Sequence, residues 1–408
     1  MATTSTSSPR HFTRLIHRPA PGTNDKLAAG SGPGTSSVID KQPSVTFDKS
    51  GASLIVDSET EQVLRRHPDL YLADGSVIVR AEDTLFRVHI SMLSRHSIFF
   101  RDVFGMPKGG EGVDQLDGCP VLFLQDRAED VANLLSALYD GPVLRDNSPD
   151  DFRVVAGVCR LATKYLIDTL RVKTIAHLSK AWPSTLKEWD AREDAARVHE
   201  IALASSNPPT HPRYPNPVDV VNLAREVDAP SLLPSALYDL SRYPFTQIFE
   251  DQSVSLDVHD LQRLCLGKEA AQHAITTLIQ SMTHAQFGRQ FPYHTHIRSA
   301  SKGKASAHGS AVCMSPAACR KDFAELVELA TQHYLFDRER GCGDPLYVAE
   351  ELGQLKSVEF SECAACARSL EAWAAREREK MWKMIPTWFR LESPTPEDSP
   401  RTSGELSR

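Results

Sequence analysis

The chain has 408 residues and a formal net charge of -7, with 46 Lys and Arg against 53 Asp and Glu. Hydrophobic residues make up 41% and charged residues 24%, which is typical of a globular protein, and the length predicts two or three domains. The acidic balance argues against a protein that coats nucleic acid through a general surplus of basic residues. No run approaches the roughly 18 apolar residues that a membrane helix needs. We therefore expect neither nucleic acid nor a membrane as a partner.

The first segment, residues 1–58, is rich in Ser, Thr, Pro and Gly and is predicted to be a disordered head. Its start is polar and lacks the apolar stretch of a secretory signal. Arg10, Arg14 and Arg18 precede the first acidic residue and weakly resemble a mitochondrial presequence, but a disordered tail is the favoured interpretation. We expect a protein of the cytoplasm, the nucleus or both. Its eight cysteines are then expected as thiols or metal ligands rather than disulfides.

Residues 67–142 alternate apolar runs with turn residues and predict a compact block. Period-2 and β-branched runs predict strands, whereas apolar residues at three- and four-residue spacing predict helices. The predicted elements are, in chain order, a turn at Asp74–Gly75, strands at 76–80 and 84–89, one or two short helices over 92–104, a strand at 121–124 and a helix over 131–138. The two adjacent strands predict a β-hairpin. Asp126 is a candidate cap for the last helix, which Gly141 and Pro142 are expected to end.

The remainder has helical periodicity and is divided by segments rich in Pro, Gly and Ser. The predicted organisation is a compact domain with following helices at 67–182, a helical region at 183–300 interrupted by a Pro-rich linker at 205–217, a helical block at 313–391 that carries cysteines and tryptophans, and a disordered tail at 392–408. The fold class predicted for the whole chain is α+β.

The compact block resembles the BTB/POZ domain, in the variant abundant in mushroom-forming (basidiomycete) fungi. The order of hairpin, helices, strand and helix carries the resemblance together with ten landmark residues and the closing Tyr-x-Gly. These landmarks are Asp74, Phe86, His89, Leu93, Phe99, Phe100, Phe104, Leu134, Leu135 and Tyr139. The lead-in over 67–75 matches the fungal variant, whereas the helical remainder is similar only loosely.

The resemblance implies a docking module: homodimerisation or binding of another protein chain, with no catalysis of its own. The landmark aromatic and leucine residues would fill the core, where burying each side chain contributes roughly 1.5–3 kcal/mol. His89 lies between a strand and a helix and is expected to hydrogen-bond the backbone there. Asp74 is expected to act as a turn residue.

Two alternative functions stay open. Family members that deliver substrates to cullin-type ubiquitin ligases carry a hydrophobic-x-Glu signal after the second helix, but here glycines precede Glu111. Members that dimerise by strand exchange use an amino-terminal helix and strand, and residues 58–72 are expected to supply one short helix at most. A transcription-related regulator would need a DNA-reading element, which the sequence does not reveal.

The sharpest chemical motif is the CxxC pair Cys363 and Cys366, in a stretch predicted to be helical from 362 to 383. Two cysteines three residues apart on a helix present their sulfurs on one face. Zinc takes four ligands, so Cys313 and Cys319 are the candidates for a second pair, with Cys342 as a substitute. Three interpretations compete: thiols packed between helices, which is favoured, structural zinc, and redox chemistry.

Three tryptophans of the same block, Trp373, Trp382 and Trp388, outline an apolar face with neighbouring aliphatic residues. Core packing is the favoured interpretation and a partner groove the alternative. Pro386 is expected to interrupt the helix before Trp388. The sequence contains no phosphate loop and no nucleophile elbow, and at 199–203 Leu203 replaces the second histidine of a zinc-protease helix. We therefore predict no catalytic residues and no bound cofactor.

Overall fold

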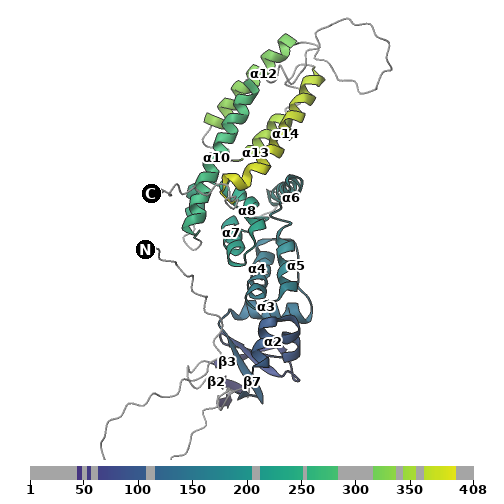
Figure 1. Cartoon of the computed structure of the whole chain (residues 1–408), viewed down its shortest axis with the longest axis vertical. Helices are drawn as coiled ribbons and strands as arrows, with labels where there is room; N and C mark the ends of the chain where they lie inside the picture. Colours follow the sequence, from purple (N-terminus) through teal and green to yellow (C-terminus); the bar gives the residue numbers. More distant parts are fainter. Residues whose placement is uncertain are drawn as a thin grey trace, which may run out of the picture. The chain divides into compact units, whose positions relative to one another are not determined.

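The computed structural model divides into two compact units, with the boundary between His177 and Leu178; the expected boundary lay after residue 182. It describes residues 44–47, 53–56, 63–106, 115–204, 212–250, 255–283, 316–336, 343–354 and 363–391. Figure 1 labels the elements of both units. The amino-terminal unit combines a sheet with helices, and the described part of the carboxyl-terminal unit is helical. The architecture is therefore α+β with a mostly helical remainder.

The amino-terminal unit contains a mixed sheet with the strand order β1-β2-β3-β5-β4-β7-β6. Its strands are β1 (Ser44–Phe47), β2 (Ser53–Val56), β3 (Val63–Tyr71), β4 (Val77–Ala81), β5 (Thr84–Val88), β6 (Gln115–Leu116) and β7 (Cys119–Leu124). The expected hairpin is β4 and β5, which pair antiparallel around Glu82 and Asp83. The expected third strand, β7, lies parallel to β4.

Alternation along β4 and β5 divides the sheet into two apolar faces. Val77, Val79 and Ala81 of β4 belong to the main core, together with Phe86 of β5. Ile78, between them in sequence, belongs to a smaller buried cluster on the other face. Successive side chains of a strand point to opposite faces, so this pattern fixes the register of the hairpin.

Five helices lie among the described residues of the amino-terminal unit: α1 (Ile90–His96), α2 (Ile98–Gly105), α3 (Ala128–Tyr139), α4 (Pro149–Lys164) and α5 (Asp168–Leu178). Ser97 separates the first two, because its hydroxyl accepts the Phe100 N–H at 3.0 Å and so caps α2. The predicted cap at Asp126 is wrong. Glu82, from the hairpin turn, accepts the first amide of α3 at Ala128 instead, at 2.9 Å. Asp126 binds Lys164 Nζ at 2.6 Å and so ties the start of α3 to the end of α4.

The carboxyl-terminal unit consists of helices α6 (Leu186–Ala204), α7 (Pro217–Glu226), η1 (Pro230–Leu232), α8 (Leu233–Ser241), α9 (Phe245–Glu250), α10 (Val258–Thr283), α12 (Pro316–Ala330), η2 (Thr331–Phe336), α13 (Pro345–Gln354) and α14 (Ala364–Trp388). The long helix α10 packs against α12, α13 and α14, which run beside it in Figure 1. No helix among the described residues combines the length and the apolar character that crossing a membrane would require.

Three local expectations need correction. Within residues 1–58, expected to be a disordered head, the described residues form the two short strands β1 and β2, and the rest of that segment lies outside the described residues. Residues 58–72 were expected to supply one short helix at most, and the described part of them contains the strand β3, which pairs parallel with β5.

The third correction concerns Pro386, which does not interrupt α14 but lies inside it, two residues before its end. A proline inside a helix removes one intrahelical hydrogen bond and crowds the preceding turn, and here the helix ends two residues later. The expected tail at 392–408 and residues 205–211 of the expected linker lie outside the described residues.

Candidate functional site

The apolar landmarks of the amino-terminal unit lie in or against one core. Phe86, Leu93 and Phe100 are each at most 1% exposed. Phe99 and Phe104 are only partly buried and pack against that core from its edge. The ring of Phe100 stacks on Tyr165 with 4.9 Å between centroids, which joins α2 to the end of α4. Leu134 and Leu135 of α3 are buried in the same cluster.

The three polar landmarks form one hydrogen-bonded chain. His89 Nε2 lies 3.2 Å from Asp74 Oδ2, and its Nδ1 lies 2.9 Å from the Tyr139 hydroxyl. The same hydroxyl accepts the backbone N–H of His89 at 3.0 Å. The His89 side chain therefore bonds two other side chains, and the expectation that it binds the backbone is wrong. Asp74 is both a turn residue and an ionic partner. These hydrogen bonds connect the turn before β4, through His89, to the end of α3.

The pKa values of Asp74 and Tyr139 follow from the position of these hydrogen-bonded side chains near the surface. The hydrogen bond from His89 holds the pKa of the Asp74 carboxyl below its ordinary value, and Asp74 is exposed. Partial burial raises the pKa of the Tyr139 hydroxyl, and the Asp74 charge acts in the same direction. Tyr139 is therefore neutral near pH 7 and can both donate and accept hydrogen bonds. The arrangement positions backbone elements and leaves the tyrosine un-ionised.

Helix α2 carries large apolar side chains that are exposed to solvent. Ile98 at its start is 46% exposed and Met106 just beyond its end is 54% exposed. Arg101 and Asp102 lie between them on the solvent side, with 3.9 Å between their closest charged atoms. Large exposed apolar residues with charges of both signs between them suit contact with another protein. The expected ligase-recruitment position, Glu111, lies outside the described residues.

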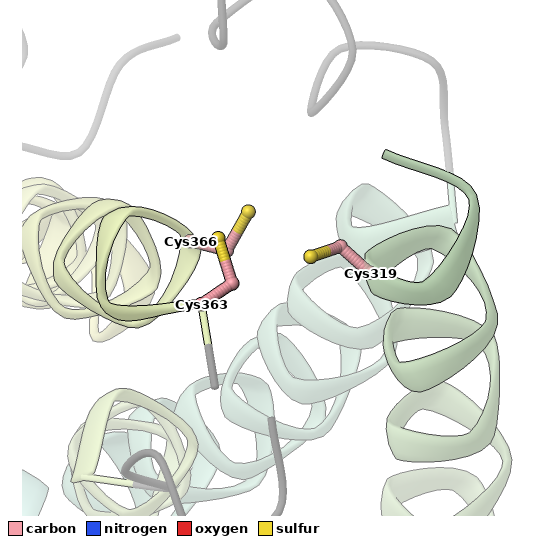
Figure 2. Close-up of side chains that lie close together, drawn as sticks. All are labelled: Cys319, Cys363 and Cys366. Atoms are coloured by element: carbon pink, nitrogen blue, oxygen red, sulfur yellow. The ribbon is translucent and has the colours of Figure 1, made fainter. Parts of the chain in front are cut away.

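Three of the four predicted zinc candidates come together in the carboxyl-terminal unit. The sulfur atoms of Cys319, Cys363 and Cys366 all lie within 4.8 Å of one another, and each residue is 4% exposed. Cys319 lies in the first turns of α12, whereas Cys363 and Cys366 lie at the start of α14. Figure 2 shows the Cys319 side chain pointing across to the two sulfurs from α14. Cys313 and Cys342 lie outside the described residues.

The tryptophan face of α14 is mostly core. Trp373 and Trp382 are 4% and 9% exposed, and Trp382 donates its indole N–H to the Ser184 carbonyl at 3.0 Å. Trp388 is half-buried and lines a groove of about 370 Å³ between α10 and α14, together with Trp373, Met381 and His273. Most of the apolar face of α14 is therefore used for core packing, as favoured from the sequence. Only the part near Trp388 lines a groove, which was the alternative interpretation.

A histidine and an aspartate, two residue types common in catalytic sites, form a buried pair in the amino-terminal unit. In the amino-terminal unit His177 Nε2 lies 2.8 Å from Asp151 Oδ2, and both side chains are 2% exposed. The Asp151 carboxylate also accepts the N–H groups of Arg145 and Asn147, at 3.1 and 2.8 Å. A carboxylate held by two backbone amides and closed off from solvent stabilises the start of α4. It has no exposure through which a substrate could reach it.

Sequence reasoning missed a buried ionic network in the carboxyl-terminal unit. Asp239, which is 1% exposed, accepts hydrogen bonds from Arg192 and Arg242. Arg242 also reaches Glu193 at 2.7 Å and Asp344 at 3.1 Å. Burial opposes the charge on Asp239, but the two arginines outweigh it and lower the pKa of that carboxyl. The signal in the sequence was a charged residue at an apolar position of a helix, as at Asp239 within Leu-Tyr-Asp-Leu.

Comparison of the chain with protein-family models and with curated proteins gives no match. Function is therefore argued from where these residues lie.

Proposed function

We propose that the chain is a protein-docking protein whose amino-terminal unit is a BTB/POZ-like module, and that a second copy of the chain binds to the outer face of α2. The observation that carries the proposal is the hydrogen-bonded chain of Asp74, His89 and Tyr139. The resemblance names these residues as landmarks, although up to 65 positions separate them, and they meet in an α+β unit in which a hairpin, two helices, a strand and a helix follow one another as expected from the sequence.

The choice of a second copy as the partner rests on the composition of the α2 surface. A two-fold interface uses the same patch on both subunits, so each patch must complement itself. Arg101 and Asp102 are adjacent and of opposite sign, so each can face the other residue of a second copy. Ile98 and Met106 supply exposed apolar side chains at either end of the same helix. Burial of such side chains is the main favourable contribution to association.

The proposal is tested by light scattering after size-exclusion chromatography of the purified full-length chain. The expected mass is twice the 45.2 kDa of one chain. Ile98→Asp should convert the protein to a monomer, because a carboxylate buried in an interface loses its water without gaining a partner. The matched control is Val172→Asp on α5 of the same unit, which is 63% exposed and should leave the dimer unchanged.

Far-UV circular dichroism of each variant must match that of the unaltered chain, so that loss of the dimer is not loss of the fold. A monomer at about 100 µM, well above a micromolar dissociation constant, would contradict the proposal. So would a dimer that tolerates Ile98→Asp as well as it tolerates the control.

A further inference from the structure

Three buried cysteines converge where two helices of the carboxyl-terminal unit begin. Cys363 occupies the position before the first residue of α14, and Cys366 is the third residue of that helix. Cys319 is the fourth residue of α12. Their sulfurs lie within 4.8 Å of one another, although more than forty positions separate Cys319 from the other two. From these residues we infer a metal site, which is independent of the docking proposed for the other unit.

The spacing of the sulfurs suits a tetrahedral ion. With metal–sulfur bonds of about 2.3 Å, tetrahedral geometry places neighbouring sulfurs about 3.8 Å apart. The sulfurs lie at most 4.8 Å apart, so they need to approach one another by about an ångström at most. Figure 2 shows the Cys319 side chain of α12 directed towards the Cys363 and Cys366 side chains at the start of α14.

The electrostatic setting favours thiolates. The first amides of a helix lack partners within the helix, and the helix dipole places partial positive charge at that end. Cys319 and Cys366 lie within the first four positions of α12 and α14, and Cys363 immediately precedes α14, so two such helix ends flank one set of sulfurs. Helix starts are a setting in which cysteines ionise and react as thiolates.

Apolar packing alone explains the cluster less well. The three cysteines form a buried cluster of their own, to which only Phe323 and Ala365 add partly buried apolar side chains among the described residues. A seam that needed only to exclude water would be served as well by alanine or valine. Cysteine at all three buried positions instead places three sulfur ligands together, and soft and borderline divalent ions prefer sulfur.

We propose that Cys319, Cys363 and Cys366 bind one Zn²⁺ ion as three thiolates, and that a water molecule fills the fourth position of the tetrahedron. Binding replaces three S–H protons by one ion, so three protons are released and the site carries one net negative charge. The ion fixes the start of α12 to the start of α14, and α12, α13 and α14 all pack on α10. Its role is structural, because it joins two helices that are distant in sequence.

The first experiment measures zinc in the full-length chain purified under reducing conditions and dialysed against metal-free buffer after exposure to ZnCl₂. We expect about one zinc per chain, and Cys366→Ser should lose most of it. The control is Cys265→Ser, because Cys265 is an exposed cysteine of α10 outside the cluster and its removal should leave the zinc content unchanged.

A second measurement does not depend on a variant that folds. Replacement of zinc by Co²⁺ in the unaltered chain should give the intense near-ultraviolet absorption of thiolate-to-cobalt charge transfer, and excess ZnCl₂ should abolish it. Zinc content below a tenth of an ion per chain, or a Cys363–Cys366 disulfide in the protein isolated with its thiols alkylated, would overturn the proposal. So would cobalt binding without the charge-transfer band.

Discussion

Truncation of Phe100 probes the core of the amino-terminal unit most directly. The side chain is 1% exposed and contacts the rings of Phe99, Phe104 and Tyr165, with centroids 4.9 to 6.2 Å away. Burial of a phenylalanine side chain contributes roughly 1.5–3 kcal/mol, and a cavity left by its truncation adds a further cost. Alanine retains part of that burial but leaves a cavity. We therefore expect Phe100→Ala to lower the free energy of unfolding by about 3–5 kcal/mol.

The assay exploits the distribution of tryptophan. All five lie in the carboxyl-terminal unit: Trp182, Trp189, Trp373, Trp382 and Trp388. In a urea titration, tryptophan fluorescence reports that unit, whereas far-UV circular dichroism reports both. Phe100→Ala should move the part of the dichroism change that comes from the amino-terminal unit to lower urea. It should leave the fluorescence transition of the carboxyl-terminal unit in place.

The matched control is Val172→Ala on α5 of the same unit, which is 63% exposed and lies outside the proposed interface, and which should change the stability by no more than about 0.5–1 kcal/mol. Phe99→Ala should lie between the two, because Phe99 is only partly buried. If Phe100→Ala and Val172→Ala gave equal shifts, the placement of Phe100 in the core would be refuted.

Two further predictions concern single side chains. Asp239→Asn should destabilise the carboxyl-terminal unit by about 3–5 kcal/mol, because two arginines lose their buried partner. Since its pKa is lowered in the folded protein, Asp239 contributes stability that is present above the ordinary carboxyl pKa of 3.8 and is lost as the pH falls through the lowered value. Fluorescence-detected unfolding should accordingly depend less on pH below about 4 in the variant, and an unchanged slope would contradict this. Gly75→Ala should destabilise the amino-terminal unit, because the added Cβ would lie 2.7 to 2.9 Å from side-chain and backbone atoms of Arg87; an unchanged dichroism transition would count against that close approach.

Local pattern was sufficient for most elements of the amino-terminal unit. The β-branched and strand-like runs at 76–80 and 84–89 predicted β4 and β5, and the change to helical spacing after 92 predicted α1 and α2. The strand β3 was missed because its sequence, with charged residues and Pro68, lacks period-2 alternation. It forms through pairing with β5, which is a contact between strands and leaves little trace in the composition of one of them.

The sites show the same division. The CxxC spacing identified Cys363 and Cys366, because two sulfurs three positions apart on a helix must share a face. That Cys319 meets them depends on how α10, α12 and α14 pack. Likewise, Asp74, His89 and Tyr139 could be picked out as landmarks but not as bonded partners.

The sequence by itself determined the α+β class of the chain, the hairpin and most helices of the amino-terminal unit, and the residue types able to hold a metal. Periodicity and turn chemistry act between near neighbours, so they can be read along the chain. The tertiary structure decided which distant side chains touch: the three sulfurs, the Asp74–His89–Tyr139 chain and the buried Asp239 network. Those contacts depend on how whole helices and strands pack together. Packing brings together side chains that are distant in sequence, so no short stretch of sequence specifies it.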